Sequence, residues 1–285
     1  MKKVLKWIGI VLGGLVALIV LVFIGLYLSA AFRLNKTYAI SVEAINIPND
    51  PAAAERGKKW VSILCTECHG DNLSGTVVFE DPALGRIDAS NLTPGAGGVG
   101  KEYTDADWVR AIRHGVGPDG KPLLVMPSAD FYNLNDQDLG DIIAALKSLP
   151  PVDNAIPGPE LTPLGQVLFA AGAFGNIIDA ERIDQNGPRP AAVAPGVNTA
   201  YGDYLTKLIG CRTCHGDNFA GGKDPNPKAP PAPNITQGGI LKTWSEADFI
   251  TAARTRKSEF MPWRDLNGMT DDELKALWLY LKTRK

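Results

Sequence analysis

The strongest constraint on this fold is a short motif that occurs twice and contains every cysteine of the chain. Residues 65–72 read Cys-Thr-Glu-Cys-His-Gly-Asp-Asn, and residues 211–218 read Cys-Arg-Thr-Cys-His-Gly-Asp-Asn. The chain has 285 residues and only 4 cysteines, so each motif holds one pair. A chain of this length can form one large or two ordinary domains. The repeated motif favours two.

The segments that follow each motif also match, in the same order and with shorter loops in the second copy. The matched pairs are 91–93 (Asn-Leu-Thr) with 234–236 (Asn-Ile-Thr), 103–113 with 244–254, Met126-Pro127 with Met261-Pro262, and 134–147 with 269–282. A repeat of this period is that of a whole domain rather than of a solenoid unit. The sequence therefore predicts two tandem copies of one domain.

Each copy has the apolar spacing of helices and no convincing alternation typical of strands. In the first copy we expect helices within 55–65, 104–115 and 135–149, the second starting at a capping signal formed by Thr104 and Asp107. The predicted fold is all-α. The expected segments are 1–32 as a membrane anchor, 33–54 as a tether, 55–150 as the first domain, 151–197 as a Pro-rich connector that packs on both domains, and 198–285 as the second domain.

Cys-x-x-Cys-His is the attachment motif of haem c. Two cysteines three positions apart lie on one face of a helical turn, where each sulfur can bond to one haem vinyl group, and the histidine that follows can ligate the iron. The motifs predict two covalently bound haem c groups, held by Cys65, Cys68 and His69 and by Cys211, Cys214 and His215. Either cysteine pair could instead form a disulfide or half of a zinc site.

A second axial ligand is needed for each iron, and methionine fits the pattern. Met126 and Met261 occupy matched positions, and a proline that stiffens the loop follows each. Met269 starts a predicted helix and matches Leu134, which favours a place in the core. His114 has no histidine in the second copy; it is either an ordinary loop residue or a ligand that replaces Met126. A His/Met pair raises the reduction potential, which suits a carrier late in a respiratory chain.

Six further matched residues are candidates for haem contacts. Arg113 and Arg254 could pair with propionates, or be solvated arginines at helix ends. Asn91 and Asn234 could bond propionates, or form ordinary turns. Tyr103 and Trp244 could line a haem edge, or merely begin a helix.

The N-terminus predicts a single-pass membrane protein. Three lysines precede an uncharged run, Trp7 to Phe32, that is long enough to span a bilayer. The lysines place the N-terminus in the cytoplasm and the rest of the chain on the periplasmic side. A cleaved signal peptide is the alternative, but its apolar region is usually shorter.

Net charge excludes one class of partner. The formal charge is −2, too balanced to suggest binding to nucleic acid. Residues 55–150 carry 9 basic and 14 acidic side chains, whereas residues 198–285 carry 13 and 10. This contrast suggests two docking faces, one for an electron donor and one for an acceptor.

The motifs, read together with Met126-Pro127 and the runs 91–94, 103–115 and 136–152, closely resemble the cytochrome c subunits of membrane-bound alcohol, aldehyde and gluconate dehydrogenases. The resemblance covers residues 55–285 and implies class I cytochrome c domains. Those subunits carry three haem domains, whereas two copies occur here. The resemblance implies a dihaem cytochrome that takes single electrons from a membrane dehydrogenase or quinol-oxidising complex and passes them to an oxidase or soluble cytochrome. The alternatives are a peroxidase-type enzyme, with one haem open or ligated by His114, and a purely structural subunit.

Overall fold

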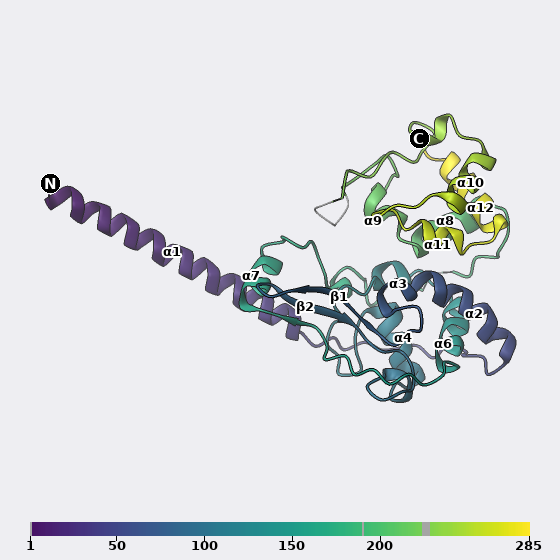
Figure 1. The fold of residues 1–285 in the computed structure, drawn as a ribbon, viewed down its shortest axis with the longest axis horizontal. Coiled ribbons are helices and arrows are strands. Elements are labelled where there is room, and N and C mark those ends of the chain that lie inside the picture. The colour runs from purple at the N-terminus through teal and green to yellow at the C-terminus, as the bar shows by residue number, and fades with distance from the viewer. Residues whose placement is uncertain (1, 190, 224–228) are drawn as a thin grey trace.

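The computed structural model describes residues 2–189, 191–223 and 229–285 of the chain. A long N-terminal helix is followed by two helical domains that pack against each other (Figure 1). The expected all-α fold class with an N-terminal apolar helix is confirmed. The first part of the chain contains α1 (Lys2–Asn35), α2 (Pro51–Leu64), α3 (Thr66–His69), β1 (Thr76–Asp81), β2 (Gly85–Ala89), η1 (Val99–Lys101), α4 (Asp105–His114), α5 (Ser128–Phe131) and α6 (Asp136–Lys147).

The second part continues through a connector into the second domain. Its elements are β3 (Glu160–Leu161), α7 (Pro163–Ala170), η2 (Asp179–Glu181), α8 (Thr199–Leu208), α9 (Cys211–His215), η3 (Ile240–Lys242), α10 (Glu246–Thr255), α11 (Trp263–Asn267) and α12 (Asp271–Lys282).

The helix α1 is long and apolar enough to cross a membrane. Its most apolar window has a mean hydropathy of 2.9 and none of it is buried against the rest of the chain. A helix that is apolar on every side and exposed in this way suits a bilayer rather than water. The helix continues past the predicted boundary at Phe32 and ends at Asn35.

Within the segment expected to be a tether, residues 36–50 form a strap packed along the first domain. Tyr38 N–H donates to the carbonyl of Gly120 at 2.9 Å, and Val42, Ile45 and Ile47 pack on the main hydrophobic cluster. Glu43 is paired with Arg189 at 2.7 Å. Tyr38, Ile40, Val42, Ile45 and Ile47 give the strap a half-buried side.

The first domain is built where α2 crosses α6. A Cβ atom at Gly57 would lie only 1.9 Å from the carbonyl oxygen of Asp141, so a larger residue would force the two helices apart. The helix α4 begins at the predicted capping box of Thr104 and Asp107 and ends at Gly115, which adopts the left-handed conformation. The N–H of Leu123 donates to the carbonyl of Gly115 at 2.8 Å and the hydroxyl of Ser128 donates to that of Ala111 at 3.1 Å, which ties the loop that carries Met126 to the end of α4.

Two strands of a small antiparallel sheet lie between α3 and α4, in a domain whose sequence shows no convincing strand alternation. β1 pairs with β2 with an irregularity between Val77 and Phe79, and β2 also pairs with β3. The prediction of no strands here was wrong. The strands are short, and their apolar residues do not alternate.

The second domain repeats the first in the order α8, α9, α10, α11 and α12 (Figure 1). Here α8 crosses α12, and a Cβ atom at Gly202 would lie 2.1 Å from the carbonyl oxygen of Ala276. Gly202 is the match of Gly57 in the sequence repeat, so the same close helix crossing is built twice.

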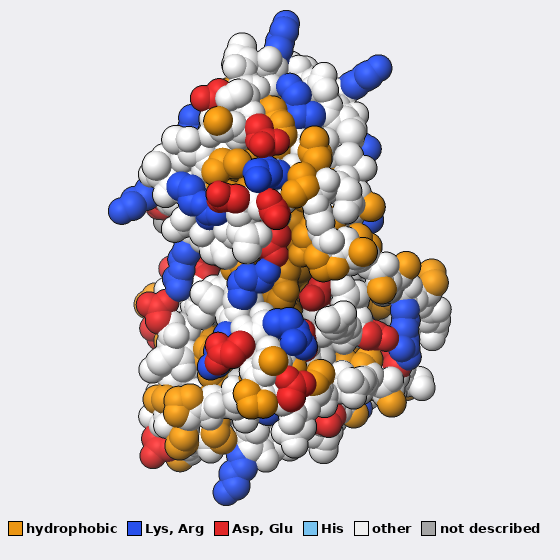
Figure 2. Space-filling view, turned by 90° about the vertical axis from the view of Figure 1, so that its right-hand side faces the viewer, with side chains coloured by type: hydrophobic (Ala, Val, Ile, Leu, Met, Phe, Trp, Pro, Cys, Tyr) orange, Lys and Arg blue, Asp and Glu red, His pale blue; other side chains and the backbone are white. Residues whose placement is uncertain are grey.

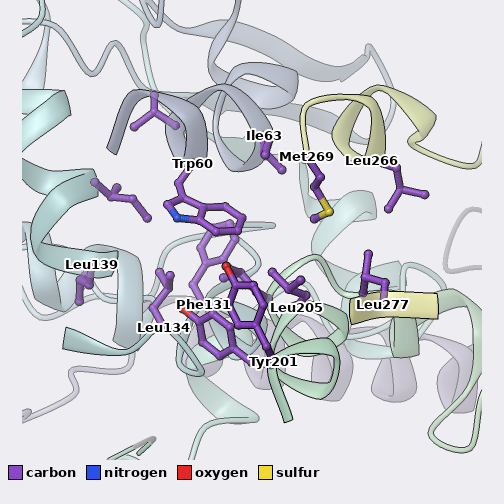
Figure 3. Packing of buried hydrophobic residues seen from close by; sticks show 14 of the residues in the cluster. Trp60, Ile63, Phe131, Leu134, Leu139, Tyr201, Leu205, Leu266, Met269 and Leu277 are labelled. Carbon is purple, nitrogen blue, oxygen red and sulfur yellow. The ribbon is translucent and has the colours of Figure 1, made fainter. Parts of the chain in front are cut away.

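The two domains share one continuous hydrophobic cluster. Figure 3 shows Trp60, Ile63 and Phe131 of the first domain close to Leu205 and Met269 of the second. Met269 is 3% exposed, which confirms its predicted place in the core. The domains therefore pack directly on one another, and no linker separates their cores.

The connector lies mainly along the first domain and α1. The carbonyl of Val152 accepts bonds from Asn91 and Thr93, and α7 packs on α1. At the junction with the second domain, Arg182 lines a polar hollow with Lys207, and Val193 packs on the cluster that both domains share. The connector therefore contacts both domains, as expected, although most of it lies on the first.

Candidate cofactor sites

The first Cys-x-x-Cys-His motif lies at the junction of α2 and α3. Cys65 ends α2 and begins α3, and Cys68 and His69 lie on the single turn that follows. The Nδ1 atom of His69 lies 2.7 Å from the carbonyl oxygen of Ser90. A carbonyl only accepts, so Nδ1 carries the proton and Nε2 presents its lone pair. Burial lowers the pKa of His69, which favours this neutral form.

The second motif has the same construction. Cys211, Cys214 and His215 lie on α9, which follows Gly210 in the left-handed conformation. The Nδ1 atom of His215 lies 2.8 Å from the carbonyl oxygen of Pro233. Ser90 and Pro233 each precede the matched asparagine of the Asn-x-Thr segment. That segment thus supplies the carbonyl that orients each histidine.

Each histidine opens onto a large apolar cavity. The first has a volume of about 1160 Å³, open mouth included, and the second about 1300 Å³. A concave, mainly apolar wall with a few polar groups is typical of a cofactor site. Cys65, Cys68, His69 and Met126 line the first cavity. Cys211, Cys214, His215 and Met261 line the second. The residues predicted from spacing alone therefore meet in two matched cavities.

The donor atoms fit haem c. Cys65, Cys68 and Cys211 are free thiols, so neither motif forms an internal disulfide. Burial raises the pKa of Cys65 and of Cys211 to about 12, so both thiols are uncharged. No cluster of three or more metal-ligating side chains occurs within residues 2–189, 191–223 and 229–285, which disfavours the zinc alternative.

Tyr103 and Trp244 line the matched cavities, as expected for residues at a haem edge. Tyr103 packs edge-on against Trp108, with ring centroids 5.1 Å apart. The indole N–H of Trp108 is buried at the first cavity and has no hydrogen-bond partner among the described residues. A bound group with a polar edge would satisfy this donor, which is a second indication of fit.

Arg113 and Arg254 do not line either cavity. The Arg113 guanidinium donates to the carbonyl of Leu134 and to Asp136, both at 2.8 Å. Arg254 donates to the carbonyl of Asn267 at 2.7 Å and to Asp271 at 2.7 Å. Arg113 thus links the end of α4 to the start of α6, and Arg254 links the end of α10 to the loop between α11 and α12. This arrangement favours their structural role over contact with a propionate.

Asn91 and Asn234 are also absent from the cavity walls. The Oδ1 atom of each accepts a bond from the backbone N–H two residues later, at 2.9 Å for Asn91 and 2.8 Å for Asn234. This is ordinary Asx-turn chemistry. The turns shape the loops whose carbonyls hold the two histidines.

His114 does not line the first cavity. It is 3% exposed, and its Nδ1 lies 2.7 Å from Gln185 while its Nε2 lies 3.4 Å from Glu43. Its two nitrogens thus face the strap and the connector. This placement disfavours His114 as a replacement for Met126.

Sequence reasoning missed two residues of the second cavity. Arg256 lies 4.8 Å from the ring centroid of Trp244 and 5.7 Å from that of Trp263. Asp265 also lines this cavity, and burial and the nearby Glu67 raise its pKa to about 7. The repeat does contain a signal for Asp265, because Asp130 stands at the matched position, four residues after the other methionine. Arg256 is matched by Gly115, so the repeat gives no indication of it.

Comparison with known families supports the same two domains. Residues 54–150 match the family model of cytochrome c, and residues 202–281 match that of cytochrome c oxidase, cbb3-type, subunit III. Neither match includes α1 or most of the connector.

Several curated relatives align along most of the chain. The chain is 27% identical over 274 residues to the cytochrome c subunit of a quinone alcohol dehydrogenase from Gluconacetobacter polyoxogenes, covering 82% of this chain and 56% of that protein. It is 30% identical over 250 residues to the fructose dehydrogenase cytochrome subunit of Gluconobacter japonicus, covering 77% and 50%. It is 30% identical over 164 residues to the gluconate 2-dehydrogenase cytochrome c subunit of Pantoea cypripedii, covering 53% and 35%. The chain spans about half the length of the first two.

Proposed function

Because the chain carries two cytochrome c domains in tandem, we propose that it binds two haem c groups and passes single electrons between a membrane donor and a respiratory acceptor. The observation that carries this proposal is the meeting of a Cys-x-x-Cys-His motif and a methionine in each of two matched cavities. Haem c supplies an iron that gains and loses one electron at a time.

The residues that would hold the groups follow from the cavity walls. Cys65 and Cys68 would form the thioether bonds in the first domain, with His69 and Met126 as the axial ligands. Cys211 and Cys214 would do so in the second domain, with His215 and Met261. The carbonyls of Ser90 and Pro233 fix the ring orientation of the two histidines, which keeps each Nε2 aimed and basic.

The cavity walls are mainly apolar. Apolar side chains dominate both linings, including Ile142 and Leu146 in the first and Leu277 and Leu281 in the second. An apolar site in which a histidine and a methionine would both hold the iron favours electron transfer over substrate chemistry. The protein therefore acts as a carrier subunit in this proposal.

The apolar helix α1 would anchor the protein in the cell membrane, with both domains on the periplasmic side. The support is the length and exposure of α1 and the lysines that precede it. A fusion reporter that is active only outside the cytoplasm, placed after Lys285, should be active.

The donor would be a membrane dehydrogenase or quinol-oxidising complex, because the relatives are named as subunits of dehydrogenases for alcohol, fructose and gluconate. The acceptor would be an oxidase or soluble cytochrome. Charge alone does not separate the two docking faces, since acidic and basic side chains are interspersed over both domains on the side turned away from α1 (Figure 2). Isolation from gently solubilised membranes should recover a dehydrogenase subunit with this chain.

The axial methionines provide the sharpest test. A methionine sulfur bound to ferric haem gives a weak far-red absorption band. Met126→Leu and Met261→Leu should each remove about half of this band if each domain holds one His/Met haem. Met269→Leu is the matched control, because Met269 is buried between the domains and lines neither cavity. If Met126→Leu leaves the band intact, the assignment of the first site is wrong, and peroxidase activity should then be measured.

A further inference from the structure

An uncharged segment projects from the connector beside α1. Residues 163–175 (Pro-Leu-Gly-Gln-Val-Leu-Phe-Ala-Ala-Gly-Ala-Phe-Gly) include α7 and the turn that follows it, and Gln166 is their only polar side chain. Phe169 is fully buried, which fixes one side of α7. The other side is open, with Leu164 43% exposed and Ala171 and Ala173 also exposed. We call residues 163–175 the α7 segment.

The α7 segment is packed on the end of the apolar helix. α7 lies alongside α1 and extends further along it than the rest of the first domain (Figure 1). Ala30 of α1 is fully buried in a cluster with Phe169 and Phe174. One helical turn earlier, Leu26 is also partly covered. The contact therefore reaches into the apolar run of α1.

A polar cluster marks where α1 leaves the apolar environment. Arg33 donates to Glu181 at 2.7 Å and to Asn176 at 3.1 Å, and its guanidinium lies 4.2 Å from the centre of the Phe169 ring. Lys36 lies 4.5 Å from the ring centre of Tyr38. Arginine, lysine and tyrosine are typical of the headgroup level of a membrane.

The depth of the contact follows from helix geometry. The uncharged run from Trp7 to Phe32 is about 39 Å long at 1.5 Å per residue, which exceeds a hydrocarbon core of about 30 Å. Centred on that run, the core ends near Ala30. Leu26 lies roughly 10 Å before Arg33 along the helix axis. The part of the α7 segment that covers α1 is thus level with the outer edge of the hydrocarbon.

We propose that the α7 segment inserts its open side into the periplasmic headgroup and acyl boundary of the bilayer, as a second membrane contact beside α1. This inference rests on the anchoring role proposed for α1. At this depth, contact of an uncharged apolar surface with lipid is more favourable in free energy than its contact with water. Two contact points also fix the rotation of the first domain about α1. The first cavity is thereby held in one orientation to the membrane.

The test is the depth of single labels in the full-length haem-loaded protein, reconstituted in bilayers of phosphatidylcholine and phosphatidylglycerol. A fluorophore is attached to Ala173→Cys and, as a second site, to Leu164→Cys. Quenching is compared between a lipid with a nitroxide below its headgroup and aqueous iodide. Ile19→Cys reports the middle of α1, and Val197→Cys, at a position 44% exposed on the connector before α8, reports water. The protein without an added cysteine should take up no label.

Labels at positions 173 and 164 should lose most of their fluorescence to the lipid nitroxide and little to iodide, like the label at 19 and unlike that at 197. If both behave like the label at 197 while the label at 19 is quenched by lipid, the α7 segment lies in water and this inference is wrong, although α1 still spans the membrane. If the label at 19 is itself open to iodide, the anchor fails and this inference fails with it.

Discussion

Asp130 should make the folded protein less stable as the pH rises. It lies on α5 of the first domain and faces the second, where a Cβ atom on Gly210 would be 2.8 Å from its Oδ2. Burial and, to a smaller extent, repulsion by Asp179 raise its pKa to about 6, although Arg182 and a hydrogen bond with Thr213 act in the opposite direction. The carboxyl group therefore keeps a proton in the folded state at a pH where the unfolded chain has lost it.

The size of the effect follows from linkage. An aspartate in an unfolded chain titrates near its ordinary pKa of 3.8. Between this value and about 6 the native state binds more protons than the unfolded state, so the free energy of unfolding falls as the pH increases. A difference of about two pKa units corresponds to about 3 kcal/mol. This loss develops between about pH 4 and pH 6 and persists at higher pH.

Asp130→Asn removes the titrating proton and keeps a partner for Thr213. In urea unfolding followed by far-ultraviolet circular dichroism, the variant should match the parent protein near pH 4 and exceed its stability by about 2–3 kcal/mol near pH 8. Glu160→Gln, at an exposed position on β3, should leave the pH dependence unchanged. The reasoning fails if Asp130→Asn and the parent protein lose stability in parallel between the two pH values.

Three further substitutions test the packing that positions the sites. Leu205→Ala should cost about 2–5 kcal/mol, since Leu205 is fully buried in the cluster shared by both domains, and calorimetry should show both domains unfolding at the lower temperature. Tyr204→Phe should cost about 1–2 kcal/mol in urea unfolding, because it removes the hydroxyl that donates to Asp138 at 2.5 Å across the domain junction. Thr104→Ala and its match Ser245→Ala each remove a capping box and should each lower stability by about 1 kcal/mol; an unchanged urea midpoint would show that the caps contribute nothing.

The main features of the sites were accessible from the sequence because they depend on local spacing and on duplication. The turn that carries Cys65, Cys68 and His69 is a property of five consecutive residues, and the same turn recurs at Cys211. Met126 could be chosen because its match, Met261, stands at the equivalent place in the second copy. The prediction of fold class succeeded for the same reason, since the longer helices of both domains (α2, α4, α6, α8, α10 and α12) each have an apolar face and a side-chain N-cap.

The features that were missed depend on contacts between distant segments. The strap from 36 to 50 carries apolar residues from Tyr38 to Ile47, but the surfaces that cover them are formed by distant segments, and Glu43 gains its role only when Arg189 folds back on it. β1 exposes Val77 and Val78 and is formed by pairing with β2, not by alternation. Arg113 was linked to propionates because it is matched by Arg254. A match between the two copies does not tell whether a repeated arginine links two helices or contacts a cofactor.

The junction between the domains shows that the duplication extends beyond each separate fold. Lys59 of α2 and Tyr204 of α8 occupy matched positions. Each contacts the carboxylate at the third residue of the last helix in the other domain: Lys59 pairs with Glu273 of α12, and Tyr204 donates to Asp138 of α6.

The short helix after each methionine also packs on the other domain. α5 of the first domain packs on α8, and α11 of the second packs on α2. The helix that follows each methionine therefore rests on the helix that leads into the other domain's Cys-x-x-Cys-His motif. Both Cys-x-x-Cys-His motifs are thus supported from across the junction by the helix that follows the other domain's methionine.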